Sequence, residues 1–178
     1  MFTKYRSIAL AAVIILSSFT ILYIAEWEIG KGYIVRFDGK YAKGSFSDLS
    51  GLITFDPENL QAAKFDVSVK VASIETGNDL KNKHAKSDKW FDAEQFPEIH
   101  FTSSEVTRID SAFVVRGMLE LRGIRKEVAI PFTFQQKGAG SLFYGKFKVN
   151  RGDFGIGKTN GKDSDSTLVE VSVPVISH

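Results

Sequence analysis

Apolar and polar residues alternate with a period of two along most of this 178-residue chain. In the segment 65–71, Phe65, Val67 and Val69 alternate with polar side chains, so they share one face of an extended strand. The same alternation recurs at 33–37, 49–56, 99–110, 113–121, 128–134, 143–149 and 169–175. Long helical segments between these runs are missing, so the pattern predicts about eight antiparallel strands.

An all-β chain of this length closes into a barrel or folds as a sandwich. Short stretches rich in Gly, Asp and Asn separate the predicted strands, as tight turns require. The apolar faces are dominated by Val and by the 15 Phe residues. Eight strands enclose a space that side chains can fill or that can hold one small ligand. The alternation alone fits both a filled and a hollow barrel.

One internal segment does not follow the strand pattern. Residues 78–91 are polar and contain almost no β-branched side chains, and several lysines lie along them. This composition predicts a short helix or a structured loop.

The N-terminal segment predicts export. Lys4 and Arg6 precede 18 residues, 8–25, that carry no charge. As a helix, this stretch would span roughly 27 Å, close to the hydrocarbon thickness of a bilayer. Basic residues before it and acids after it place the N-terminus inside and the remainder outside. We therefore expect a signal-anchor or a signal peptide at 1–25, followed by a domain at 26–178.

Both forms of this segment remain open. The apolar run is longer than in most cleaved signal peptides, and bulky Tyr23 stands where a small residue precedes a cleavage site. These features favour an uncleaved anchor over a cleaved peptide. Either form predicts a periplasmic protein, and the anchor predicts attachment to the inner membrane.

Charge and composition exclude several classes of function. Without Lys4 and Arg6, 21 basic side chains remain against 21 acidic ones, so a nucleic-acid-binding surface is not predicted. Cysteine is absent, which excludes disulfides and thiolate ligands. His84, His100 and His178 lack the spacing of a zinc site. The sequence therefore predicts no metal, no cofactor and no catalytic residues.

Two blocks of sequence carry a specific resemblance. Residues 73–103 read SIETGNDLKNKHAKSDKWFDAEQFPEIHFTS, and residues 150–156 read NRGDFGI. Within and between them, the matching positions are Ser73, Ile74, Thr76, Gly77, Asn78, His84, Ser87, Asp88, Phe91, Asp92, Phe96, Pro97, Phe101, Gly117, Leu119 and Gly123. In order and spacing these resemble the YceI-like family of lipid- or polyisoprenoid-binding β-barrels, over roughly Trp27 to Ile176.

The resemblance implies a lipocalin-like barrel that holds a polyisoprenoid or other long-chain lipid without converting it. Each methylene removed from water contributes about 0.8 kcal/mol, so such a chain needs few polar contacts. Ordering the chain on binding offsets part of that gain. The inward faces of the predicted strands then become the cavity lining, represented by Phe65, Val67, Val69, Phe101, Val115, Leu119, Ile130, Phe132, Phe147 and Val171.

A lipid head group must stay hydrated or be paired. Lys81 and His84, in the irregular segment, and Asn150 and Arg151, after a strand end, are the predicted head-group contacts. The alternative is structural: 150–153 forms a hydrogen-bonded turn and Arg151 pairs with an acid, either Asp153 or Asp92.

The chain departs from the family pattern in the irregular segment. Members often carry Arg-Asp where this chain has Lys81-Asn82, and Leu where it has Ala85. The usual Asp-Phe-Phe-Asp is Lys-Trp-Phe-Asp at 89–92. The neighbourhood is therefore more basic, which either suits an anionic head or means that the family's contacts are not preserved here. The smaller side chain at 85 widens the entrance.

Two other functions remain possible. One is an enzyme that acts on an isoprenoid-type lipid with His84 or Asp92 as acid or base. The other is a ligand-free barrel that serves as an interaction module. The sequence predicts neither the head group, the chain length nor the oligomeric state.

Overall fold

The structure is a computed structural model that describes residues 26–137, 140–158 and 165–177. The expected signal or anchor at 1–25 lies outside the described residues, as does His178. In the described part, no helix is long and apolar enough to cross a bilayer.

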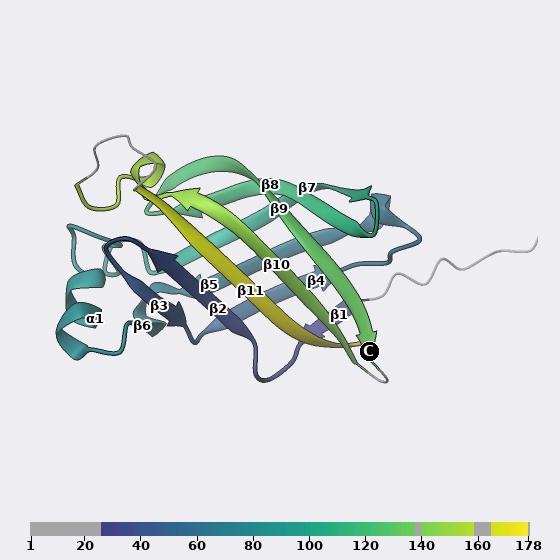
Figure 1. The fold of residues 1–178 in the computed structure, drawn as a ribbon, viewed down its shortest axis with the longest axis horizontal. Helices are drawn as coiled ribbons and strands as arrows, with labels where there is room; N and C mark the ends of the chain where they lie inside the picture. The colour runs from purple at the N-terminus through teal and green to yellow at the C-terminus, as the bar shows by residue number, and fades with distance from the viewer. Residues whose placement is uncertain (1–25, 138–139, 159–164, 178) are drawn as a thin grey trace, which may run out of the picture.

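The described residues form one antiparallel sheet of eleven strands, closed because β1 pairs with both β4 and β11 (Figure 1). The strands are β1 (Glu26–Ile29), β2 (Ile34–Gly39), β3 (Lys43–Phe46), β4 (Leu49–Thr54), β5 (Lys64–Lys70), β6 (Ile74–Glu75), β7 (Glu98–Ile109), β8 (Ala112–Leu121), β9 (Ile124–Lys137), β10 (Gly140–Asn150) and β11 (Ser166–Ser177). The helical elements are α1 (Asp79–Ala85) and the 3₁₀ turns η1 (Leu60–Ala62), η2 (Val71–Ser73) and η3 (Arg151–Phe154).

These strands occupy eight positions around the barrel. β1 pairs with residues 175–177 of β11 and β2 with residues 167–172, so together they form one interrupted strand. β3 and β4 form a second interrupted strand, because β3 pairs with β2 and β4 pairs with β1. The short β6 is added at the edge of β3. The predicted all-β, antiparallel, eight-stranded barrel with one short helix is confirmed.

The predicted inward faces are confirmed as well. Along β8, Phe113, Val115, Gly117, Leu119 and Leu121 are buried, and the residues that alternate with them are not. Gly117 continues this face because a Cβ there would lie 2.3 Å from the Thr102 carbonyl oxygen and 2.8 Å from the Phe101 ring. The glycine therefore lets an aromatic side chain lie directly against the neighbouring strand.

Three short strands were missed by the alternation: β1, β3 and β6, the last of only two residues. β1 alternates as Glu-Trp-Glu-Ile, but it directly follows the uncharged stretch and was not separated from it. β3 reads Lys-Gly-Ser-Phe and has one buried side chain, Phe46, so its pattern is too short to detect.

The predicted short helix in 78–91 is confirmed as α1. Asn78 precedes it in an extended conformation, and its side chain accepts a hydrogen bond from the Lys81 backbone N–H. This contact satisfies one of the unpaired donors at the start of the helix. Five backbone hydrogen bonds among residues 84–93 then continue the chain as a compact loop.

The two ends of the barrel differ in packing. At the end that carries the β4–β5 connection, six rings fill the interior, and we call them the aromatic plug: Phe55, Phe65, Phe113, Phe132, Phe134 and Phe143. Phe55 is fully buried and contacts the other five with ring centroids 5.0–6.2 Å apart. α1, η3 and the β2–β3 connection gather at the opposite end (Figure 1).

Candidate functional site

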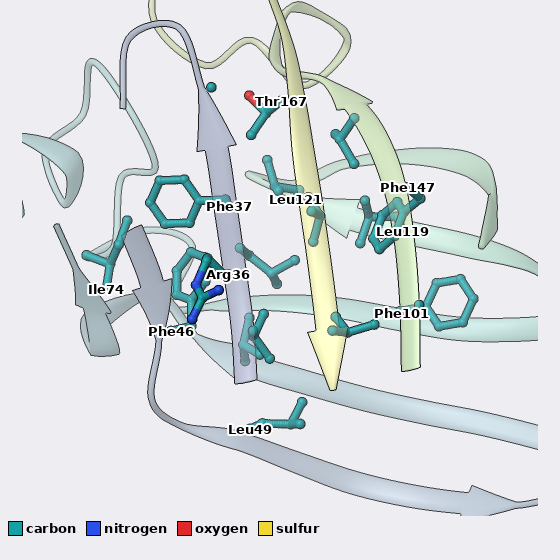
Figure 2. Close-up of a pocket in the computed structure, with 18 of the residues that line it drawn as sticks. Arg36, Phe37, Phe46, Leu49, Ile74, Phe101, Leu119, Leu121, Phe147 and Thr167 are labelled. Atoms are coloured by element: carbon teal, nitrogen blue, oxygen red, sulfur yellow. The ribbon is translucent and has the colours of Figure 1, made fainter. Parts of the chain in front are cut away.

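A cavity of about 730 Å³ occupies the half of the barrel beyond the aromatic plug. Side chains from every position around the barrel line it, and Figure 2 shows part of this wall, including Phe37, Phe46, Leu119 and Phe147. Its size lies within the roughly 300–1,000 Å³ of ligand sites in proteins. Aliphatic and aromatic side chains make up most of the wall. The barrel is therefore filled at one end and hollow at the other.

The structure places all ten residues predicted to line the cavity on its wall: Phe65, Val67, Val69, Phe101, Val115, Leu119, Ile130, Phe132, Phe147 and Val171. The alternation sufficed to find them because it determines which side of each strand faces inward. That they contact a ligand stays a prediction.

Some inward-facing residues of the cavity are less buried than the innermost residues of the filled half. Phe147 and Val171 point inward, yet they are only partly buried because they border the cavity. In the filled half, Phe55 is 0% exposed and Val175 is 1% exposed. Phe65, Phe132 and Phe143 belong to the aromatic plug and also line the cavity, so their rings form its floor.

The mouth of the cavity lies between α1 and the β2–β3 connection. The exposed lining residues there are Lys40, Tyr41, Lys43, Lys81 and His84. All charged side chains of the described lining are basic, and no aspartate or glutamate borders the cavity. An apolar interior with a basic rim suits a molecule with a hydrocarbon chain and an anionic end.

Arg151 is held firmly at this mouth. Its guanidinium donates to the Asp165 carboxylate at 2.7 Å and to the carbonyl oxygens of Ile156 and Lys158, each at 2.8 Å. The guanidinium also lies 4.6 Å from the ring centroid of Tyr41 and 5.9 Å from that of Trp90. The predicted acid partner, Asp153 or Asp92, is wrong, because Asp165, directly before β11, pairs with the arginine instead.

The other predicted head-group residues are placed differently from one another. Lys81 and His84 lie on α1 and border the cavity. Asn150 does not border it, and its side-chain oxygen accepts a hydrogen bond from the Gly152 N–H at 2.8 Å. This is the hydrogen-bonded turn that the sequence left open, and it begins η3.

Asn82 fastens α1 to the barrel. Its side-chain oxygen accepts from the N–H and the hydroxyl of Thr76, both at 2.7 Å, and its amide donates to Glu75 at 3.0 Å. The Asn82 hydrogen bond, with a second from the Gly77 N–H, holds the pKa of the Glu75 carboxyl below its ordinary value of 4.5. The helix that carries Lys81 and His84 is therefore positioned by β6.

Sequence reasoning missed the aromatic residues at the mouth. Trp90 and Phe91 line the cavity from the loop after α1, and Tyr41 lines it from the β2–β3 connection. Two adjacent aromatic residues in an otherwise polar segment were the available signal. The basic side chains Lys40 and Lys43 gave none, because exposed lysines in turns are common.

The described residues do not assemble a recognisable catalytic group. His84 is exposed on α1, and Asp92 stands in a turn with a left-handed φ of 52°. No cluster of three potential metal ligands occurs in the described part of the chain. His100 pairs with Asp66 at 2.6 Å, on the partly exposed faces of β7 and β5 and not among the lining residues.

Comparison with known sequences identifies the family. The YceI-like domain matches residues 30–176 of this chain. The chain belongs to the YceI-like family. A UPF0312 protein of Photorhabdus laumondii is 33% identical over 138 residues, which cover 73% of this chain and 71% of that protein. A second UPF0312 protein, from Pseudomonas savastanoi, is 32% identical and covers 86% of this chain and 90% of its own length.

Solved structures share this barrel. BcnA of Burkholderia cenocepacia superposes with a TM-score of 0.74 at 26% identity, over 80% of this chain and 95% of that one. A domain from Saccharophagus degradans, described as polyisoprenoid-binding, has a TM-score of 0.65 at 12% identity over 88% of this chain and all of its own. The second likeness shows the fold alone.

Proposed function

We propose that this YceI-like barrel binds a polyisoprenoid or a similar long-chain amphiphilic lipid, and that it sequesters or carries the lipid without converting it. The observation that supports this is the 730 Å³ apolar cavity whose charged border is entirely basic. Burial of the hydrocarbon supplies the affinity, at about 0.8 kcal/mol for each methylene before the ordering cost. The polyisoprenoid-binding description of the Saccharophagus degradans domain agrees with this ligand class.

The rim selects an anionic head such as a phosphate. Lys81 and His84 approach the mouth from α1, and Lys40 approaches it from the facing connection. Lys43, at the start of β3, also borders the cavity but pairs with Asp38 at 3.1 Å. The Arg151 Nε–H has no hydrogen-bond partner among the described residues, but it is buried, so a head-group oxygen reaches it only if the contacts of Arg151 with Asp165 and the two carbonyls open. Attraction at such an exposed rim is screened by salt, so binding should weaken as ionic strength rises.

The place of action is part of the proposal. Residues 1–25 carry the charge pattern of an export signal, so the barrel acts in the periplasm, held at the inner membrane if the segment is not cleaved. N-terminal sequencing of the protein from membrane and soluble fractions tests this. If the protein in the soluble fraction begins near residue 26, the segment is cleaved and the barrel is released from the membrane.

Native mass spectrometry of the purified full-length protein tests the binding itself. We expect a co-purifying lipid mass, or uptake of added geranylgeranyl phosphate that leaves the ligand unchanged. A protein that stays bare with every offered lipid would contradict the proposal and favour an interaction module. Conversion of the ligand, lost in His84→Ala, would favour an enzyme.

A further inference from the structure

The aromatic plug closes one end of the barrel behind the cavity. The floor rings Phe65, Phe132 and Phe143 come from β5, β9 and β10, and each contacts the buried ring of Phe55 behind them. Because three separate strands supply the floor, no single side chain can move aside to open a passage. A chain entering from the mouth meets a solid surface partway along the barrel axis.

The outer side of the plug is also covered. Trp27 donates from its indole nitrogen to the Phe55 carbonyl oxygen at 2.8 Å and packs edge-on against Phe134 at 5.3 Å. Arg108 lies 5.1 Å from the Phe113 ring and donates to the Pro57 carbonyl of the β4–β5 connection. These contacts hold the plug from the side opposite the cavity.

The volume in front of the plug fixes how much chain fits. If each carbon takes roughly the 30 Å³ that a water molecule occupies in the liquid, 730 Å³ holds on the order of 25 carbons, or about five isoprene units. Further units must remain at the mouth, where they gain little from burial.

We infer that the aromatic plug acts as a ruler that limits the buried hydrocarbon to about five isoprene units. This inference rests on the proposed function and specifies its ligand by length. Each buried methylene raises affinity about fourfold before ordering costs. Affinity should therefore climb steeply with chain length until the floor is reached and change little afterwards.

Competition for the full-length protein between all-trans prenyl monophosphates, read by native mass spectrometry, tests the limit. Occupancy should rise by roughly tenfold or more per unit from farnesyl through geranylgeranyl to geranylfarnesyl phosphate. Hexaprenyl, octaprenyl and undecaprenyl phosphates should then bind within about threefold of geranylfarnesyl phosphate. Affinity that keeps rising up to octaprenyl phosphate would contradict the length limit and leave the proposed function intact. Absence of binding at every length would overturn the proposed function itself.

Two variants of the aromatic plug test whether its floor rings set the limit on the length of buried hydrocarbon. Phe143→Ala removes a floor ring and should move the plateau to hexaprenyl phosphate. Phe113→Ala removes a ring of the same plug that does not border the cavity, so the plateau should stay at geranylfarnesyl. If the alanine variants do not fold, Phe143→Leu and Phe113→Leu make the same comparison. Phe143→Leu should then raise the affinity for hexaprenyl phosphate by less than Phe143→Ala would. A plateau that is identical in all foldable variants would overturn the assignment.

Discussion

Arg151 connects the cavity mouth to the long β10–β11 connection. Its ion pair with Asp165 is almost completely buried, and the two carbonyl bonds fix the guanidinium between Tyr41 and Trp90. Burying two charges is costly, and their mutual attraction offsets this only when the geometry and the extra hydrogen bonds are good. Removing Asp165 leaves the Arg151 charge buried with carbonyl oxygens but no opposite charge to compensate it.

Asp165→Ala should therefore lower the free energy of unfolding by about 3–5 kcal/mol. Urea denaturation followed by circular dichroism measures the change. Asp153→Ala is the matched control, because Asp153 is exposed on η3 and its removal should change stability by less than about 0.5 kcal/mol. Equal effects of the two substitutions on the free energy of unfolding would show that the buried ion pair contributes no more stability than an exposed carboxylate.

Lys81 tests the charge of the rim at the level of a single side chain. Lys81→Glu should weaken binding of geranylgeranyl phosphate roughly three- to tenfold at low salt, since it replaces an attraction of up to about 1 kcal/mol by a repulsion. Binding of uncharged geranylgeraniol should be unchanged. Lys64→Glu, an exposed lysine at the plug end and outside the lining, supplies the control. A similar loss for the uncharged alcohol would argue against recognition of the head.

At the scale of elements, α1 depends on its contact with β6. The pKa of Glu75 is lowered in the folded protein, so this contact stabilises α1 above pH 4.5 and is lost as pH falls through the lowered value. Asn82→Ala should bring the pKa of Glu75 back toward 4.5, as an NMR titration of the carboxyl would show. Acid should also accelerate amide exchange in α1 of the unmodified protein.

Asn78→Ala separates this contact from helix stability in general. It removes the cap at the Lys81 N–H and should destabilise α1 by about 1 kcal/mol. It does not touch Glu75, whose pKa should stay low. If both variants raise that pKa equally, loosening of the helix, and not the lost Asn82 hydrogen bond, is the cause.

The elements differ in how far the sequence predicts them. Strands such as β8 were predicted because ten residues of alternation leave one inward face, and the same property located the cavity wall. β3 was missed because four residues carry too little pattern. The Arg151–Asp165 pair was missed because the two residues are 14 positions apart in the sequence and no spacing rule relates them.

At the scale of the molecule, the barrel divides stability and binding between its two halves. The aromatic plug packs rings edge to face, an arrangement that stabilises beyond simple burial. The hollow half leaves apolar side chains such as Val171 without protein neighbours on one side, which costs packing energy that a ligand can restore. The same Phe and Val alternation builds both halves, so the sequence alone left open whether the barrel is filled.

A ligand that fills the hollow half must raise the stability of the whole barrel. At a free ligand concentration of 100 times Kd, the gain is about 2.7 kcal/mol, which raises the Tm of a chain of this size by roughly 5–10 °C. Val171→Trp fills the cavity from its wall and should abolish this rise, because the indole takes the place of the chain. Ser172→Trp places the same ring on the opposite face of β11 and should leave the rise intact. Differential scanning calorimetry with and without geranylgeranyl phosphate measures both variants. A ligand-induced rise that survives in Val171→Trp would place the bound lipid elsewhere on the protein.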